Sequence, residues 1–393
     1  MFLEELKDFL KPEREEKKVE YIELIYDLIF VYIIGRNSSL IHNMEGGFID
    51  PDIVLTFIFC TMIAIQIWNI TNLFINRYGN NGLIEHILIL GNMYLLYFMA
   101  DATKLHWQDS YFRYNIAWGL ILLNIALAYF LKYKKISSIK PWEVFQMKMS
   151  ITMVLIMAAI VFISLPLYSL TGIPFSPVAM VFGIVFMFAT KDIHDLVPVD
   201  FGHLSERVML YIVFTFGEMI IAISGYFEGK FSFNTFYFSL MGFLIVVGLF
   251  QTYEIFYDHL LDRELITSGM TYMALHIFII FALSCITAAL EFMREEEVDL
   301  LPKIIFLTAS FVVYFVFLYL LGIFTKRKAR PTKKFILLQI ISLAGFAALM
   351  ILFREHMYIN IAFSVLLVFG NLYIIAMEKR EYLKACKCTE AKN

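Results

Sequence analysis

Long apolar stretches alternate with short polar segments along the whole chain. Twelve apolar runs can be recognised, each close to the roughly 20 residues that a helix needs to cross the hydrocarbon core of a bilayer. They cover residues 23–41, 52–76, 83–103, 112–132, 147–168, 174–191, 204–227, 233–256, 267–291, 302–325, 334–353 and 357–377. This pattern predicts an all-α polytopic membrane protein with about 12 transmembrane helices.

The composition agrees with a chain that lies mostly in lipid. Of its 393 residues, 60% are hydrophobic and 17% are charged, against roughly 45–50% and about 25% in soluble domains. The net charge of −3 gives no basic surface, which excludes nucleic acid as a partner. The four cysteines, Cys60, Cys285, Cys386 and Cys388, predict no disulfide framework. We expect the lipid bilayer and a small solute or lipid as partners, and no cofactor or metal site.

Lysine and arginine residues are distributed unevenly among the polar segments. If the N-terminus lies inside, the inner segments hold 24 basic residues and the outer loops hold six. An excess of lysine and arginine is typical of cytoplasmic loops. We therefore predict a cell-membrane protein with both termini in the cytoplasm. Residues 1–20 carry charges of both signs and lack the short basic region and apolar core of a secretory signal, so we expect no cleaved signal.

Weak matches between the two halves of the chain indicate an internal repeat. They keep their order at offsets of 185 to 190 positions, and they pair Gln66, Trp68 and Asn69 with Gln251, Tyr253 and Glu254, then His86 and Asp101 with His276 and Glu291. We therefore predict two parallel six-helix repeats, an arrangement found in transporters. The predicted segments are a cytoplasmic N-terminal segment (1–22), the first repeat (23–191), a cytoplasmic linker (192–203), the second repeat (204–377) and a cytoplasmic basic tail (378–393).

Ionisable side chains within or beside the apolar runs are the candidates for function. A charge at the centre of a membrane helix costs roughly 2.5–3.5 kcal/mol on insertion scales, so such residues normally face a polar cavity or a partner. We predict eight residues that bind protons, cations or substrate, namely Glu23, Asp27, His203, Glu206, Arg207, Glu218, Glu254 and His276.

The spacing of these residues places several of them on common helix faces. Glu23 and Asp27 are four positions apart, which puts both carboxylates on one face of the first predicted helix. His203, Arg207 and Glu218 likewise share a face of the seventh. Glu218 lies about 16 Å further along this helix than Arg207, at a rise of 1.5 Å per residue. The sequence therefore predicts an acid near the middle of the membrane.

Other positions carry weaker signals. Gly217, next to Glu218, is expected to leave room for another helix or a ligand. Glu254 belongs to an acidic stripe in the eighth predicted span. His276 titrates near neutral pH, so a proton relay and an interfacial hydrogen bond are both open for it. The polar segment 191–195 predicts a solvated turn.

Two stretches of the chain together resemble a known family. The first is ELIYDLIFV at 23–31, and the second runs from H-x-x-E-R at 203–207 to G-E-x-I-x-A-I at 217–223. They are similar to the opening and mid-chain signatures of the low temperature requirement A (LtrA) family of bacterial multi-pass membrane proteins. The resemblance implies a role in growth at low temperature, but it supplies no reaction. The residues that it carries over are Glu23, Asp27, His203, Glu206, Arg207 and Glu218.

The leading hypothesis is a secondary transporter or permease-like carrier coupled to protons or cations. Asp27 and Glu218 are then the titrating or cation-binding acids, Arg207 is the counter-charge or anion-recognising group, and Glu254 lies at the cytoplasmic exit. Two alternatives stay open: a membrane-embedded lipid-modifying or lipid-handling enzyme, and a non-catalytic membrane scaffold. The chain has no phosphate-binding glycine loop, zinc-protease helix or nucleophile elbow. An intramembrane enzyme stays open, with Glu218 or Asp27 as its candidate acid.

Overall fold

A computed structural model of the chain describes residues 17–41, 50–103, 107–135, 140–227, 232–293, 299–326 and 331–390, with the backbone alone at 41, 107–109, 292 and 381–390. Throughout these residues the regular elements are helical, and the single β-bridge joins Leu261 to Thr325. The predicted all-α polytopic class is confirmed. The predicted absence of a cleaved signal falls on residues 1–20, of which 1–16 lie outside the described residues.

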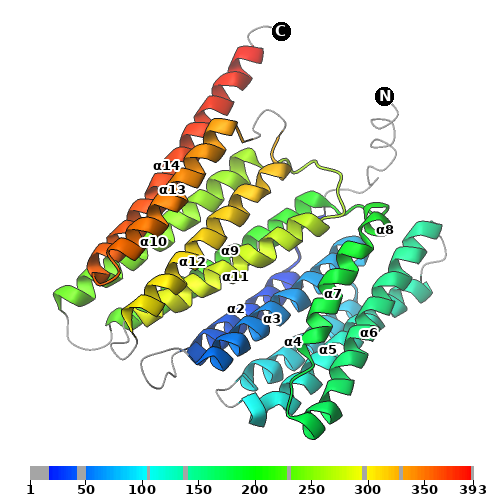
Figure 1. The fold of residues 1–393 in the computed structure, drawn as a ribbon. Coiled ribbons are helices and arrows are strands. Elements are labelled where there is room, and N and C mark those ends of the chain that lie inside the picture. Colours follow the sequence, from blue (N-terminus) through cyan, green and yellow to red (C-terminus); the bar gives the residue numbers. More distant parts are fainter. Residues whose placement is uncertain are drawn as a thin grey trace. The chain divides into compact units, whose positions relative to one another are not determined.

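Figure 1 shows the order of the helices along the chain. The α-helices are α2 (Tyr21–Ile41), α3 (Pro51–Tyr78), α4 (Leu83–Asp101), α5 (Trp107–Lys135), α6 (Pro141–Thr171), α7 (Pro177–Ala189), α8 (Lys191–Asp195), α9 (Phe201–Ser224), α10 (Phe233–Ile255), α11 (Met270–Phe292), α12 (Leu300–Leu320), α13 (Lys333–Leu352) and α14 (Met357–Glu390). Short 3₁₀ turns follow α9 (Gly225–Phe227) and α12 (Leu321–Phe324), and a π turn follows α10 (Phe256–Leu260). Each of the twelve predicted apolar runs overlaps one of these α-helices.

Ten helices in the described residues are long and apolar enough to cross a membrane. They are α3, α4, α5, α6, α9, α10, α11, α12, α13 and α14. The remaining two apolar helices differ from them. α7 has only 13 residues, fewer than the roughly 17 that a span needs, and α2 carries Glu23, Asp27 and Arg36 within its 21 residues. The figure of twelve spans therefore stays a prediction.

The residues at several helix ends explain where the helices begin and stop. Proline opens α3, α6 and α7, where its missing N–H is not needed by the helix. Gly172 ends α6 with a φ of 70°, a left-handed conformation that costs glycine nothing. Thr332 begins α13 by accepting a hydrogen bond from the backbone N–H of Phe335 at 3.1 Å.

The chain divides into two compact units. The first unit comprises Met1–Leu40, Pro51–Tyr211 and Glu264–Ile277. Within it, α5 packs between α4 and α6, and α7 packs against α6 (Figure 1). The outward faces of α4 and α5 expose large apolar side chains, among them Ile87 and Leu127. In a membrane protein such faces contact lipid.

The second unit comprises Ile41–Asp50, Ile212–Arg263 and Phe278–Asn393. Within it, α14 packs against both α10 and α13, and α12 packs against α13. A Cβ atom at Gly248 of α10 would lie 2.4 Å from Cγ1 of Val368 in α14. Glycine at this position therefore allows the two helices to approach closely. Two of the unit boundaries fall inside α9 and α11. The predicted six-helix duplication stays a prediction.

Candidate functional site

Four of the eight predicted residues meet in a buried network inside the first unit. Glu23 and Asp27 come from α2, and His203 and Arg207 come from α9. Their exposed fractions are 2%, 0%, 2% and 0%. Each helix contributes two side chains spaced four residues apart, so each pair stands on one face, one turn above the other. We call these four residues the ion-pair network.

Asp27 and Arg207 form the fully buried ion pair of the network. Nη2 of Arg207 donates to Oδ1 of Asp27 at 2.5 Å, and its Nε donates to Oδ2 at 3.4 Å. Such a bidentate contact between two charged groups is among the stronger hydrogen-bonded arrangements in proteins. Two residues of α3 complete it: Trp68 donates its indole N–H to Oδ1 of Asp27 at 2.8 Å, and Asn72 accepts from Nη1 of Arg207 at 3.1 Å.

Glu23 and His203 form the second pair. Nε2 of His203 lies 2.9 Å from Oε2 of Glu23, and Nε of Arg207 lies 3.7 Å from the same oxygen. In both pairs the residue of α9 comes 180 positions after its partner in α2, so a step of four residues along one helix matches a step of four along the other. The two helices therefore run in the same direction where they meet. Asp200 precedes α9 and accepts a hydrogen bond from the backbone N–H of His203 at 3.0 Å, which fixes the first turn of that helix.

The neighbours of His203 determine where its ring carries a proton. The backbone N–H of Asp200 donates to Oδ1 of Asn76 at 3.0 Å, so the other side of the Asn76 amide must be its NH₂ group. That NH₂ group donates to Nδ1 of His203 at 3.0 Å. Nδ1 is therefore the acceptor of the ring, and Nε2 carries the hydrogen that is donated to Glu23. His203 is neutral in this arrangement.

Aromatic rings cover the ion-pair network. The ring of Tyr211 lies 4.5 Å from that of Trp68 and 6.0 Å from that of Phe30, centre to centre. Tyr26 lies on α2 beside Asp27 and donates its hydroxyl to Thr71 of α3 at 3.2 Å. Because these rings shield the pairs from water, the charges interact more strongly than they would at a surface.

Three residues of α3 that serve the network were not predicted. They are Trp68, Asn72 and Asn76, and all three are buried. Their positions differ by four, so they form a polar stripe along one face of an otherwise apolar helix. The spacing of these residues is visible in the sequence, but an uncharged polar residue in an apolar run indicates a functional site less directly than a charged one does.

The comparison with known families decides the classification. The model of the family described as bacterial low temperature requirement A protein (LtrA) matches residues 18–370, a range that includes all eight predicted residues. The chain belongs to the LtrA family. A search of curated proteins finds no match. The family match and the apolar helices together make this chain a multi-pass membrane protein of a bacterial family.

The other four predicted residues of this LtrA family member are not part of the ion-pair network as described. Glu206 lies next to Arg207 but is exposed. In α11, Nδ1 of His276 lies 2.8 Å from the backbone oxygen of Tyr272, and the centres of the two side-chain rings lie 4.2 Å apart. Its surroundings are therefore those of a histidine in aromatic packing.

The remaining two acids belong to the second unit. Glu254 of α10 is exposed. Glu218 of α9 is half-buried and has no hydrogen-bond partner in the described part of the chain, although Glu291 of α11 is close enough to repel its charge. A Cβ atom at Gly217 would meet no other atom of the described residues within 4 Å. The expected close approach of another helix is therefore not seen among these residues, and a ligand at this glycine stays a prediction.

A second polar cluster of the first unit surrounds Arg77, which ends α3 and is buried. Its Nε donates to the backbone oxygen of Val197 at 3.1 Å, and its Nη2 donates to that of Ser268 at 2.7 Å. Nη1 of Arg77 and the side-chain nitrogen of Gln146 both donate to Nδ1 of His194, at 3.2 and 3.0 Å. Arg77 thereby ties the end of α3 to two loops of this LtrA family member.

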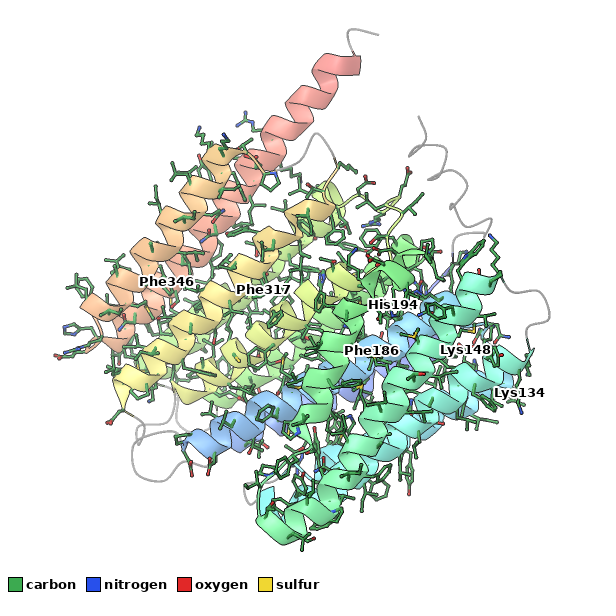
Figure 2. The ribbon with its side chains drawn as sticks, turned by 45° about the vertical axis from the view of Figure 1, so that its right-hand side comes forward. Lys134, Lys148, Phe186, His194, Phe317 and Phe346 are labelled. Carbon is green, nitrogen blue, oxygen red and sulfur yellow. The ribbon has the colours of Figure 1, made fainter. Side chains whose placement is uncertain are left out.

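The prediction of a solvated turn at 191–195 is wrong for His194. The ends of this segment, Lys191 and Asp195, form an exposed ion pair, but His194 is buried and follows α7 closely (Figure 2). The segment is the short helix α8, and α8 packs against α6 and α7. A helix buries one of its faces on such a support, whereas an isolated turn of the same sequence would be solvated.

Acidification is expected to destabilise the protein through His194. Burial, followed by the charge of Arg77, lowers the pKa of His194 from 6.5 to about 3, so the ring is neutral in the folded protein. The unfolded chain takes up this proton at higher pH. The contribution of His194 to stability is therefore complete above pH 6.5 and is lost as the pH falls from there toward 3. At pH 5 the loss is about 2 kcal/mol, at roughly 1.4 kcal/mol per pH unit.

The measurement compares the free energy of unfolding at pH 7 and pH 5 for the wild type and for His194→Gln. Glutamine keeps a side-chain oxygen that accepts from Arg77 but does not titrate. Between pH 7 and pH 5, we expect the free energy of unfolding to fall by about 2 kcal/mol less in the variant than in the wild type. An unchanged difference would show that His194 is not the group responsible.

The described residues contain no group of three or more His, Cys, Asp and Glu side chains arranged to hold a metal ion. Cys60 and Cys285 are buried and free. The side chains of Cys386 and Cys388 lie outside the described residues. The chemistry that the ion-pair network itself can perform is the exchange of protons among a carboxylate, an imidazole and a second, arginine-bound carboxylate.

Proposed function

We propose that this protein is a secondary carrier in which transport of a small solute is coupled to protonation of the Glu23–His203 pair. The observation that carries the proposal is the 2.9 Å contact between Oε2 of Glu23 and Nε2 of His203, in a buried setting where Asp27 already has Arg207 as its counter-charge. The solute and any coupling ion other than the proton are not part of the proposal.

The charge balance of the network supports a proton-binding role. Asp27 and Arg207 neutralise each other, and the neutral form of His203 leaves the charge of Glu23 uncompensated. Lys17 and Asp200, at the edge of the network, add one charge of each sign and leave the balance unchanged. A buried net charge is costly within a membrane. Uptake of one proton would make the network neutral, and the proton would be released when Glu23 gains access to water.

A line of polar atoms on α3 supports passage of a polar species beside the network. Oε1 of Gln66, Oδ1 of Asn69 and Nδ2 of Asn72 are buried and have no hydrogen-bond partner within the described residues. These three positions extend over about 9 Å of helix, at a rise of 1.5 Å per residue. Buried polar atoms of this kind normally have partners, and water or a polar solute would satisfy them.

Two features bear on orientation in the membrane. The parallel course of α2 and α9 requires an odd number of membrane crossings between them, as the five helices α3 to α7 would supply, in agreement with six spans per repeat. The excess of basic residues in alternate segments favours cytoplasmic termini. We therefore include in the proposal a cell-membrane carrier with both termini in the cytoplasm.

The test uses Glu23→Gln, with Glu206→Gln as the matched control. Both changes remove one carboxylate charge, but Glu206 is exposed on the helix that carries His203 and Arg207. Wild type and variants are placed in liposomes that contain a pH-sensitive dye. Proton movement is then recorded after Na⁺, K⁺, amino acids or sugars are added outside. The same variants are expressed at matched levels in a strain that lacks the protein, and growth in the cold is measured.

We expect wild type and Glu206→Gln to move protons with at least one of these solutes and to restore growth in the cold. Glu23→Gln should lose at least tenfold in proton movement and fail to restore growth, because glutamine neither binds nor releases a proton. Wild-type behaviour of a correctly folded Glu23→Gln protein in both assays would refute the proposal. The non-catalytic scaffold would then explain the buried network better.

A further inference from the structure

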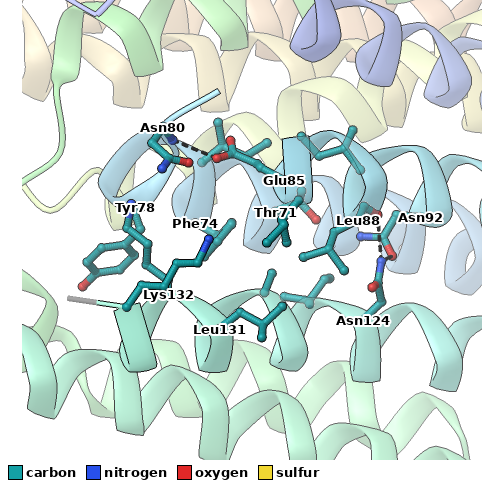
Figure 3. Close-up of a pocket in the computed structure, with 16 residues that line it drawn as sticks. Thr71, Phe74, Tyr78, Asn80, Glu85, Leu88, Asn92, Asn124, Leu131 and Lys132 are labelled. Carbon is teal, nitrogen blue, oxygen red and sulfur yellow. Dashed lines mark hydrogen bonds between the residues drawn. The ribbon is translucent and has the colours of Figure 1, made fainter. Parts of the chain in front are cut away.

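A cleft in the first unit is formed by α3, α4 and α5, and none of the four residues of the ion-pair network lines it. It encloses about 650 Å³ including the space at its open mouth. Figure 3 shows Phe74 and Tyr78 of α3 on one side of the cleft and Leu131 and Lys132 of α5 on the other. Neither the proton-binding role nor the family match assigns a ligand to this cleft.

The two ends of the cleft differ in chemistry. At one end, Lys132 and Lys135 of α5 lie with Glu85 of α4, whose Oε2 accepts a hydrogen bond from the backbone N–H of Asn80 at 2.8 Å. The opposite end is closed by Asn124, whose amide nitrogen donates to Asn92 and to a backbone oxygen of α4, both at 2.8 Å. The lining between these ends is mostly apolar.

The cleft is continuous with surfaces that face lipid. Ile84 lines it and is 43% exposed, and Ile87, one turn further along α4, is 59% exposed. In a protein that spans a bilayer, exposed apolar side chains of this size contact acyl chains. A lipid therefore reaches the cleft from the side, without crossing water.

We propose that this cleft binds one anionic glycerophospholipid. Its phosphate lies at Lys132 and Lys135, and one acyl chain follows the apolar lining toward Asn124. The 11 positions from Lys135 back to Asn124 span about 16 Å of helix, close to half of the roughly 30 Å hydrocarbon thickness of a bilayer. One leaflet's acyl chain thus fits the depth of the cleft. This proposal does not depend on the proton-coupled carrier.

The charges at the mouth select an anionic headgroup over a zwitterionic one. Two lysines and one glutamate leave one positive charge, which complements the single negative charge of phosphatidylglycerol. Phosphatidylethanolamine carries no net charge, and its ammonium group would lie beside the lysines. A basic residue near an anionic lipid surface contributes about 1 kcal/mol, which corresponds to about a fivefold change in affinity.

The experiment measures lipid retained by the purified full-length protein. Protein in detergent is mixed with equal amounts of phosphatidylglycerol and phosphatidylethanolamine of the same acyl chains, and native mass spectrometry records the bound lipid. The test variants are Lys132→Gln with Lys135→Gln, and Ala128→Phe, which fills the apolar lining. The matched control is Lys134→Gln on the same turn of α5 (Lys134 is labelled in Figure 2). Lys134 does not line the cleft and lies over the ring of Phe130.

We expect wild type and Lys134→Gln to retain one phosphatidylglycerol in preference to phosphatidylethanolamine. The double lysine variant should lose about fivefold in affinity for each charge removed, and Ala128→Phe should lose binding although both lysines remain. Equal retention of the two lipids, an equal loss in Lys134→Gln, or displacement of the lipid by excess inorganic phosphate would each overturn the proposal. If Ala128→Phe does not fold, the half-exposed and exposed lysine positions still decide the outcome.

Discussion

Replacing Arg207 with glutamine is expected to lower the free energy of unfolding by about 3–5 kcal/mol, the range for breaking one partner of a buried ion pair. Arg207 is fully buried and contacts Asp27 at 2.5 Å, Glu23 at 3.7 Å and Asn72 at 3.1 Å. Its loss leaves the carboxylate of Asp27 without a counter-charge in an apolar interior. Unfolding in mixed micelles with a titrated denaturing detergent measures the change.

A second substitution tests the reason for this loss. Asp27→Asn in the Arg207→Gln background removes the uncompensated charge, so the double variant should be more stable than Arg207→Gln alone. We expect the two single changes to be non-additive by about 0.5–3 kcal/mol, as residues in direct contact usually are. Glu206→Gln, an exposed change one residue away, should lie within about 0.5 kcal/mol of wild type. Additive single changes would show that Asp27 and Arg207 do not stabilise one another.

Replacing Arg77 with methionine is expected to cost about 2–6 kcal/mol, because two buried backbone oxygens would lose their donors at roughly 1–3 kcal/mol each. These oxygens belong to Val197 and Ser268, at 3.1 and 2.7 Å from the guanidinium group. Methionine has a similar apolar stem, so the change removes the hydrogen bonds more than the packing. Unfolding measurements give the total effect.

Amide hydrogen exchange locates the effect of the Arg77 change. Exchange should accelerate most in the loops around Val197 and Ser268, which Arg77 joins to the end of α3. The control is Arg113→Gln in the same unit, whose ion pair with Asp101 is more than half exposed at a distance of 3.7 Å. Exposed pairs of this kind contribute about 0–1 kcal/mol. Uniform acceleration across the unit, or an equal effect in the control, would contradict a local role for Arg77.

The sequence allowed the apolar helices to be predicted, and it made the ionisable residues inside them visible as candidates. A membrane helix must satisfy its backbone hydrogen bonds internally and cover itself with apolar side chains, so its position is visible as a long apolar run. Inside such a run an unusual residue is also visible: Glu23, Asp27 and Arg207 were predicted as candidates for this reason. The spacing of four between Glu23 and Asp27, and between His203 and Arg207, likewise follows from helix geometry.

The sequence did not determine which predicted residues would meet. Glu23 and His203 are 180 positions apart, and their contact depends on how α2, α3 and α9 pack, a choice that depends on the shapes of many apolar side chains. Periodicity therefore treated Glu206 and Arg207 as equal candidates, although packing leaves one exposed and buries the other. The same limit explains His194, whose polar segment resembled a solvated turn until α6 and α7 covered it.

By itself, the sequence determined what each segment must be: an apolar helix, a polar connection, or a helix with a charge that requires a partner. These are properties of a residue and its near neighbours in the chain. Only the tertiary structure decided that Asp27 belongs with Arg207, that Asn72 and Asn76 of α3 complete the network, and that Arg77 holds two distant loops. The physical reason is that a buried charge is stabilised by whichever groups the packing of helices brings within a few ångströms, however far apart they are in the sequence.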